Sequence, residues 1–270
     1  MQYDMQHLRA LRLFELNRVL EYLPPRGDVL EVGAGAGWQS EHLCSLGYEV
    51  EAVDLGGSSI FESERSFPIR TYDGHTLPFP DDSFDAIFSS NVLEHVPHIE
   101  ALLPETARVL RPGGHAVHVL PTSAWRLWTI AAHYPAMAKQ AGVRLAHRGT
   151  PPAEKSDGGH EPRASSGARL SQILLPARHG EQGNAVSEVR RFSRAQWGAL
   201  FQRTGWSVRL TASIPLLYTG YSLIGARLPI PVRSSLSRVL GAATCVFVLT
   251  PSGCMPTSPE PHSDTMAGPR

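Results

Sequence analysis

The hydrophobic pattern changes between two periods along the first half of the chain. Apolar residues recur every three or four positions from Leu8 to Leu23, and Pro24 and Pro25 follow, which predicts a helix that ends before the two prolines. The run from Asp28 to Val32 is short and rich in Val and Leu, which predicts a strand. We expect the helix to cover one face of the sheet that contains this strand.

Helical and strand patterns alternate downstream. A helix is predicted over residues 38–46 and is closed by Gly47. Three strands are predicted after it, over residues 48–53, 68–72 and 84–89. A helix over 99–110 and a strand over 115–120 follow, and Pro104 is expected to kink or restart that helix. This alternation predicts an α/β fold.

The second half of the chain has longer irregular stretches. Residues 149–168 are rich in Gly, Pro and Ser and have no hydrophobic period, which predicts a mobile loop inside an unusually long connection over 140–189. A helix is predicted to begin at Ser193, which forms a capping box with Gln196. Two more strands are predicted over residues 206–212 and 242–250.

Two apolar segments of this half each have two interpretations. Residues 123–137 are rich in aromatic side chains and directly follow a strand, so they form either a wall of a substrate pocket or an extra core helix. Residues 214–240 combine apolar side chains with arginines. The favoured interpretation is a helix packed on the sheet edge, and the other is a surface that rests on a membrane or accepts a lipid-linked substrate.

Composition narrows the class of partner. The 270-residue chain is 42% hydrophobic, and it has 25 basic (Lys and Arg) and 25 acidic (Asp and Glu) residues, so its charge does not favour nucleic acid. Cys44, Cys245 and Cys254 lack the spacing of a disulfide framework or a zinc site. The sequence has no basic leader followed by an apolar core and no apolar run long enough for a membrane span, so we expect a cytoplasmic protein.

Three alternating glycines mark the junction between the first strand and the next helix. Gly33, Gly35 and Gly37 allow a sharp turn that brings backbone N–H groups against a ligand at a helix N-terminus. Asp54 ends the next strand, 21 positions after Gly33, where a carboxylate can accept hydrogen bonds from the hydroxyls of a ribose. The pattern therefore predicts a ligand that contains a ribose.

The residues around the glycines discriminate among such ligands. Trp38 stands where a dinucleotide-binding loop needs its third glycine, and Trp38-Gln39 offers neither the Lys nor the Ser or Thr of a P-loop. Glu31 precedes the loop, and its carboxylate suits a ligand with cationic groups better than a pyrophosphate.

These residues resemble a known family. The segment Glu31-Val32-Gly33-Ala34-Gly35-Ala36-Gly37 is similar to the E/D-x-G-x-G-x-G signature of class I S-adenosylmethionine-dependent methyltransferases, whose ligand carries an ammonium and a sulfonium. Residues 77–96 and 108–114 also resemble this family. The resemblance implies that the cofactor is S-adenosyl-L-methionine.

The resemblance also implies which residues bind the cofactor. The methionine part would be held by Glu31, Gly33, Gly35 and Gly37. Asp54 would hold the ribose, and Asp73 and Gly74 would face the adenine. The methionine and the substrate entrance would be lined by Ser89, Ser90 and Asn91.

The implied fold is a Rossmann-like α/β domain over residues 1–250, with a seven-stranded, mostly parallel sheet and helices on both faces. Within it we expect a cofactor-binding core over 28–120, an insertion or lid over 121–190, and completion of the sheet over 191–250. A disordered tail is expected over 251–270, which is rich in Pro, Ser and Thr.

The implied activity is methyl transfer to a small-molecule, lipid or glycan-lipid acceptor, at oxygen or carbon. Peripheral membrane contact stays open as one interpretation of residues 214–240, and the sequence does not indicate the oligomeric state. An oxygen acceptor would need a base, and His179, which stands near Glu181, and His95 are candidates. Structural roles for both histidines are at least as well supported. His95 and His98 are three residues apart, but no further ligand clusters with them in the sequence, so we expect no metal.

Two other classes of protein stay open. A noncatalytic S-adenosylmethionine-binding protein would keep the whole first half and lack only an acceptor site. A nicotinamide-dependent oxidoreductase would share the strand, the glycines and Asp54, but Trp38 opposes it.

Overall fold

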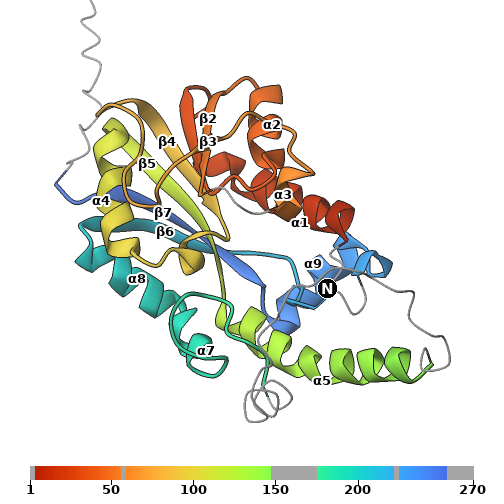
Figure 1. Cartoon of the computed structure of the whole chain (residues 1–270). Coiled ribbons are helices and arrows are strands. Elements are labelled where there is room, and N and C mark those ends of the chain that lie inside the picture. The colour runs from red at the N-terminus through yellow and green to blue at the C-terminus, as the bar shows by residue number, and fades with distance from the viewer. Residues whose placement is uncertain (1–3, 56–58, 147–174, 222–224, 254–270) are drawn as a thin grey trace, which may run out of the picture.

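A seven-stranded sheet in the order β3-β2-β1-β4-β5-β7-β6 forms the centre of the molecule (Figure 1). The computed structural model describes residues 4–55, 59–146, 175–221 and 225–253. The strands are β1 Asp28–Val32, β2 Glu49–Asp54, β3 Arg70–Thr71, β4 Phe84–Ser90, β5 Leu110–Pro121, β6 Trp206–Ile214 and β7 Thr244–Pro251. Strand β7 runs antiparallel to both of its neighbours, and the other pairings are parallel. The predicted Rossmann-like, mostly parallel sheet is confirmed.

Helices cover both faces of this sheet. The longer helices are α1 Met5–Val19, α2 Trp38–Ser45, α4 Ile99–Val109, α5 Ser123–Ala146, α8 Arg194–Arg203 and α9 Ile230–Leu240. The short ones are η1 Leu20–Tyr22, α3 Ser59–Glu62, η2 Leu93–His95, α7 Ser187–Arg191 and η3 Gly225–Arg227. In Figure 1, α1 and α2 lie on one side of the sheet, and α4 and α8 lie on the other.

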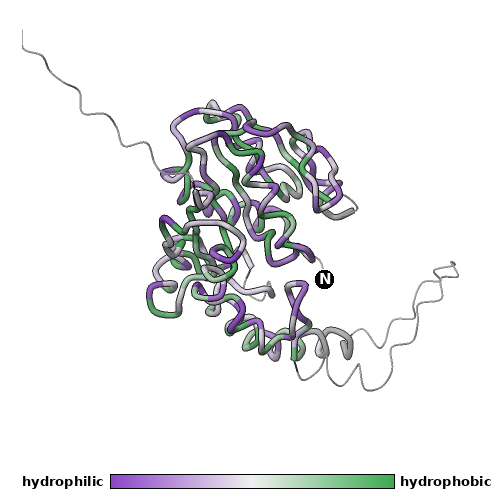
Figure 2. Tube along the Cα trace, turned by 90° about the vertical axis from the view of Figure 1, so that its left-hand side faces the viewer, coloured by the Kyte–Doolittle hydropathy of each residue, from purple (hydrophilic) through white to green (hydrophobic). Residues whose placement is uncertain are grey.

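Two clusters of buried side chains follow from this layering. Leu16 and Val19 of α1 and Leu43 of α2 pack with strand residues in one cluster. Leu102 of α4 and Phe201 of α8 belong to the other, which is the larger. Hydrophobic stretches of the chain gather in the interior of the molecule (Figure 2). Strands β1 and β4 are almost wholly buried, as expected for strands that are covered on both faces.

One helix, α4, spans Ile99–Val109, so of the two outcomes expected at Pro104 the restart does not occur. Pro104 and Glu100, whose carbonyl loses its partner there, are both exposed, so water can satisfy that carbonyl. The predicted turn before β5 is counted within the strand, which begins at Leu110 and has an irregular register opposite residues 84–86.

Some of the predictions for the second half of the chain concern residues that the structure describes. Ser193 caps α8 by accepting a hydrogen bond from the backbone N–H of Gln196, as the capping box predicts. Helix α9 occupies the segment between β6 and β7, where a packed helix was favoured. The predicted loop over 149–168 and most of the predicted tail lie outside the described residues. Among the described helices, none combines the length and the apolar character that a membrane span requires.

Candidate functional site

The loop between β1 and α2 adopts the conformation for which its glycines were singled out. The φ angles of Gly33, Gly35 and Gly37 are +76°, +58° and +80°, a region in which residues with a Cβ are strained. A Cβ on Gly33 would lie 2.4 Å from both γ-carbons of Val92, and a Cβ on Gly37 would lie 2.6 Å from the Cβ of Phe67. Glycine is therefore required at Gly33 and Gly37 for packing as well as for the turn.

Asp54 holds this loop at the end of β2. Its Oδ2 accepts a hydrogen bond from the backbone N–H of Gly35 at 2.7 Å, and its Oδ1 accepts one from the N–H of Leu55 at 2.7 Å. The backbone N–H groups of Gly33 and Ala34 both donate to the carbonyl of Val53. A carboxylate has about four lone-pair sites, so Asp54 retains acceptor capacity for ligand hydroxyls.

A cavity of about 290 Å³ lies beside the loop. Five of the residues predicted to bind the cofactor line it, namely Gly33, Gly35, Asp54, Ser90 and Asn91. Tyr72, Leu55 and Phe61 add apolar walls that the sequence analysis missed. A flat cofactor base needs such walls, but a single aromatic residue near a strand end gives no recognisable signal in a sequence.

The other five residues predicted to bind the cofactor do not line this cavity. Gly37 is buried behind the loop, and Ser89 is buried with its hydroxyl 2.8 Å from Nδ1 of His118. Asp73 accepts hydrogen bonds from the backbone N–H groups of His75 and Thr76, next to Gly74. Their roles toward the cofactor stay predictions.

Glu31 is the fifth of these residues and is buried beneath the loop. Its side chain accepts a hydrogen bond from the hydroxyl of Ser40 on α2, and the residue is 1% exposed. Burial raises the pKa of Glu31 to about 7, and the bond from Ser40 opposes that shift. Glu31 therefore joins β1 to α2 and acts on the loop from below.

A buried polar network at the carboxyl end of β4 was also missed. Glu15 of α1 is fully buried and accepts hydrogen bonds from the hydroxyls of Tyr218 and Thr244 at 2.8 and 2.7 Å. Arg12 donates to Glu15 at 2.7 Å, and Asn91, at a φ of +56°, is 3.4 Å from the same carboxylate. The network joins α1 to β4, to β7 and to the segment before α9.

A larger cavity of about 720 Å³ adjoins the first. Its walls come from α1, from α5 and from the segment between β6 and β7, and they include Trp125, Trp128, Tyr218 and Tyr221. In Figure 1, α5 runs below the N-terminal end of α1 and below α9. The two cavities share the residues Leu8, Arg12, Phe61, Asn91 and His95. The interpretation of residues 123–137 as a pocket wall is therefore supported.

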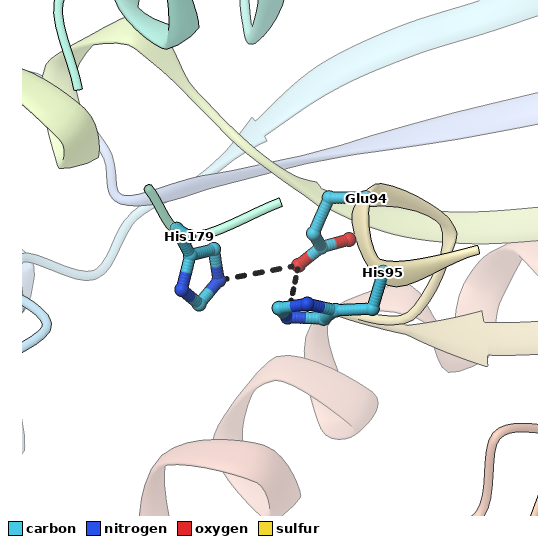
Figure 3. Close-up of side chains that lie close together, drawn as sticks. All are labelled: Glu94, His95 and His179. Atoms are coloured by element: carbon cyan, nitrogen blue, oxygen red, sulfur yellow. Dashed lines mark ion pairs between the residues drawn. The ribbon is translucent and has the colours of Figure 1, made fainter. Parts of the chain in front are cut away.

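Glu94, His95 and His179 meet at the edge of the larger cavity (Figure 3). The Nε2 atoms of His95 and His179 each lie 3.8 Å from Oε1 of Glu94, and the two rings are 4.5 Å apart. His95 and His179 line the larger cavity, and the ring of Trp125 lies 4.4 Å from His179. The two predicted candidate bases are thus brought together, with a carboxylate that the sequence analysis did not select.

The loop that carries His179 is held by a buried ion pair. Glu188 of α7 accepts hydrogen bonds from the backbone N–H groups of His179 and Gly180, both at 2.8 Å. Arg126 of α5 lies 2.8 Å from Glu188, and the two side chains are 2% and 0% exposed. A Cβ on Gly180 would lie 2.7 Å from the carbonyl oxygen of Glu94, so the loop packs directly on η2.

The strand order, the glycine loop after β1 and the acid that ends β2 define a class I S-adenosylmethionine-dependent methyltransferase fold. Residues 30–118, about a third of the chain, match the family described as "Methyltransferase domain". The family's cofactor, S-adenosylmethionine, is the one that the resemblance implied.

Curated relatives match the chain over part of its length. A ubiquinone biosynthesis O-methyltransferase of Proteus mirabilis is 27% identical over 153 residues, which are 50% of this chain and 62% of that protein. A demethylmenaquinone methyltransferase of Corynebacterium urealyticum is 39% identical over 93 residues, or 34% of this chain and 40% of that protein. The chain thus spans less than two thirds of the length of these relatives.

Solved structures share the fold at low sequence identity. A putative methyltransferase from Haloferax volcanii, solved in complex with the activator Trm112, has a TM-score of 0.54 at 14% identity and covers 92% of this chain and 95% of its own. An S-adenosylmethionine-dependent methyltransferase from Mesorhizobium loti has a TM-score of 0.50 at 16% identity, with coverages of 87% and 97%. These likenesses concern the fold alone.

The residues of the smaller cavity fit this cofactor. The loop has no side chains at Gly33 and Gly35, both of which line the cavity, and Asp54 retains acceptor capacity beside them. These residues and Asn91 would hold the cofactor, which supplies a methyl group on a positively charged sulfur.

Proposed function

We propose that the chain transfers a methyl group from S-adenosylmethionine to a largely apolar small molecule, at oxygen or carbon. The observation that carries the proposal is the larger cavity, which adjoins the loop cavity and shares Leu8, Arg12, Phe61, Asn91 and His95 with it. A noncatalytic cofactor-binding protein would not need a second cavity of about 720 Å³ at this place.

The chain's own contribution to such a reaction is positioning. Trp125, Tyr218 and Tyr221 would orient an aromatic or aliphatic acceptor and exclude water. Holding two reactants in line, with reacting atoms about 3 Å apart, accounts for much of the rate of a two-substrate reaction. The similarity to a ubiquinone biosynthesis O-methyltransferase and to a demethylmenaquinone methyltransferase supports a quinone-like acceptor.

Exposed apolar side chains on α5 and α9, two helices that contribute residues to the larger cavity, support a lipid-soluble acceptor. Leu127 and Tyr134 of α5 are each 53% exposed, and Val232 and Val239 of α9 are 43% and 86% exposed. Exposed apolar side chains on two neighbouring helices suit delivery of an acceptor from a membrane surface or from a carrier. Lipid and glycan-lipid acceptors therefore stay within the proposal.

The test is incubation with methyl-labelled cofactor and a cell extract that is then divided into small-molecule, lipid, polysaccharide, nucleic-acid and protein fractions. Label is expected in the small-molecule or lipid fraction. Label in no fraction, with intact cofactor binding, would favour the noncatalytic alternative, and label in protein or nucleic acid would contradict the acceptor class.

A variant that fills the larger cavity sharpens this test. Ala132 of α5 lines that cavity and does not line the loop cavity. We expect Ala132→Trp to reduce methyl transfer at least tenfold while cofactor affinity changes less than twofold, because the acceptor loses its space. Ala138→Trp is the matched control, since Ala138 is exposed on the same helix. Equal transfer by both variants would show that the acceptor binds elsewhere.

A further inference from the structure

Glu94, His95 and His179 have the composition and proximity of a metal-binding site. Each offers one ligand atom, and the three atoms lie within 4.8 Å of one another. They come from η2 and from a loop far away in the sequence, and Figure 3 shows both imidazole rings beside the Glu94 carboxylate. Two imidazoles with one carboxylate are a ligand set that zinc and other divalent transition metals bind.

The burial of the Glu94 carboxylate without hydrogen bonds is the second observation that favours a metal site. Its side chain has 0% exposure, and neither carboxylate oxygen accepts a hydrogen bond from any residue that the structure describes. A buried carboxylate without hydrogen bonds is costly. The distances of 3.8 Å to the two histidines exceed hydrogen-bond length, so these imidazoles do not satisfy Glu94 directly.

The spacing suits an ion between the three side chains. With ligand bonds of about 2.0–2.1 Å, two ligands of a tetrahedral zinc ion lie about 3.3 Å apart. The two distances of 3.8 Å from Glu94 to the histidines would close to that value by a shift of about half an ångström. The third pair of ligand atoms, between the two histidines, lies within 4.8 Å.

We propose that Glu94, His95 and His179 bind a divalent transition-metal ion, for which Zn²⁺ is the best chemical match. Three protein ligands leave a coordination position open to water or substrate. His95 and His179 both line the larger cavity, so the open position is available to an oxygen atom of the acceptor. This last step rests on the proposed function and narrows it to acceptors that carry a hydroxyl or enol oxygen.

The surroundings of His179 support a fixed ligand. Glu188 binds the backbone N–H groups of His179 and Gly180, and Arg126 neutralises Glu188 within the protein interior. The N–H of Glu181 donates to the carbonyl of Glu94 at 3.0 Å. The two ligand-bearing segments are therefore tied together through their backbones, which pre-organises the site without using the ligand side chains.

The experiment measures metal binding separately from activity. The full chain is stripped with a chelator and dialysed, and Zn²⁺ or Co²⁺ is added while heat of binding, metal content and the visible spectrum of the Co²⁺ form are recorded. We expect one equivalent per chain and a Co²⁺ spectrum typical of nitrogen and oxygen ligands in low coordination.

Substitutions of the proposed ligands test which side chains bind the metal ion. Glu94→Gln and His179→Ala are each expected to weaken Zn²⁺ binding at least tenfold, while His42→Ala, on the distant helix α2, should bind as the parent does. Circular dichroism and S-adenosylmethionine binding report whether the variants fold. Absence of stoichiometric metal in the parent, or equal loss in His42→Ala, would overturn the site.

Two outcomes separate this proposal from the proposed function. Asp54→Ala should lose cofactor affinity and keep the metal, which would confirm that the two sites are independent. Tight metal binding in a protein that methylates nothing would leave the metal site standing and overturn both the methyl-transfer proposal and the acceptor-facing role.

Discussion

Glu31 illustrates how burial changes the chemistry of a single residue. The sequence placed a carboxylate beside the glycine loop and suggested that it recognises a cationic ligand. In the structure it lies under the loop, bonded to Ser40, with its pKa raised to about 7 by burial. The residue therefore carries a proton over part of the neutral range, which the sequence could not indicate because burial depends on how α2 packs on β1.

This proton makes stability depend on pH. An unfolded Glu titrates near 4.5 and the folded one near 7, so the folded state holds more protons in that window. Stability is fully present below the unfolded pKa and is lost as the pH rises through the folded pKa. Glu31→Gln stays neutral, so its free energy of unfolding should fall less between pH 5 and pH 8 than that of the parent, by about 2–3 kcal/mol.

Urea denaturation without cofactor at both pH values measures this difference. Glu51→Gln, at an exposed position of β2, is the control and should retain the parent's pH dependence. If Glu31→Gln and the parent lost stability in parallel, Glu31 would be ionised in the fold and our assignment would be wrong.

At the scale of helices, strands and loops, the sequence predicted the features that depend on residues close together in the chain. The glycines of the loop need positive φ angles, and Ser193 caps a helix with its own side chain, so short patterns sufficed for both. Strands β1 and β4 were found because they are buried runs bounded by turns. The cluster at Glu94 was not found, since it forms only when the loop with His179 docks on η2.

The docking of that loop depends on the Arg126–Glu188 pair. Glu188→Ala would leave Arg126 buried without its carboxylate and would free the backbone N–H groups of His179 and Gly180. We expect a loss of about 3–5 kcal/mol in the free energy of unfolding. Hydrogen exchange in residues 175–191 should rise more than in the strands, because the loop has lost its anchor.

The exposed pair Arg178–Glu181 provides the matched control. Its side chains are 55% and 40% exposed, so Glu181→Ala should cost at most about 1 kcal/mol. The double variant Arg126→Met with Glu188→Leu should recover only part of the lost stability, since an apolar pair replaces two buried charges but leaves the N–H groups of His179 and Gly180 without their acceptor. Equal costs for Glu188→Ala and Glu181→Ala would refute the anchoring role.

For the whole molecule, Glu15 connects parts that are far apart in the chain. It links α1 to Tyr218 before α9 and to Thr244 of β7, and Asn91, which directly follows β4, lies beside it. The sequence predicts only that α1 covers the sheet, because a single acid within a helical pattern resembles any solvated residue. Its burial requires three other segments, so only the assembled fold reveals it.

Removing the Glu15 carboxylate should lower the free energy of unfolding of the whole domain. Glu15→Ala leaves Arg12 without its carboxylate and the hydroxyl of Thr244 without its acceptor, and it leaves the hydroxyl of Tyr218 only the 3.5 Å contact with Asn91. We therefore expect a loss of about 3–5 kcal/mol in urea denaturation. Glu41→Ala removes an exposed partner of Arg9 and should cost at most about 1 kcal/mol. Similar denaturation midpoints for the two variants would contradict the network's role.

The wall that the two cavities share has a thermodynamic consequence. Leu8 and Arg12 of α1 face both the loop cavity and the larger one, so a ligand in either cavity restricts the same two side chains. The side-chain freedom that the first ligand removes is not lost again when the second ligand binds. Cofactor and acceptor should therefore raise each other's affinity by the same factor, since a coupling free energy is reciprocal.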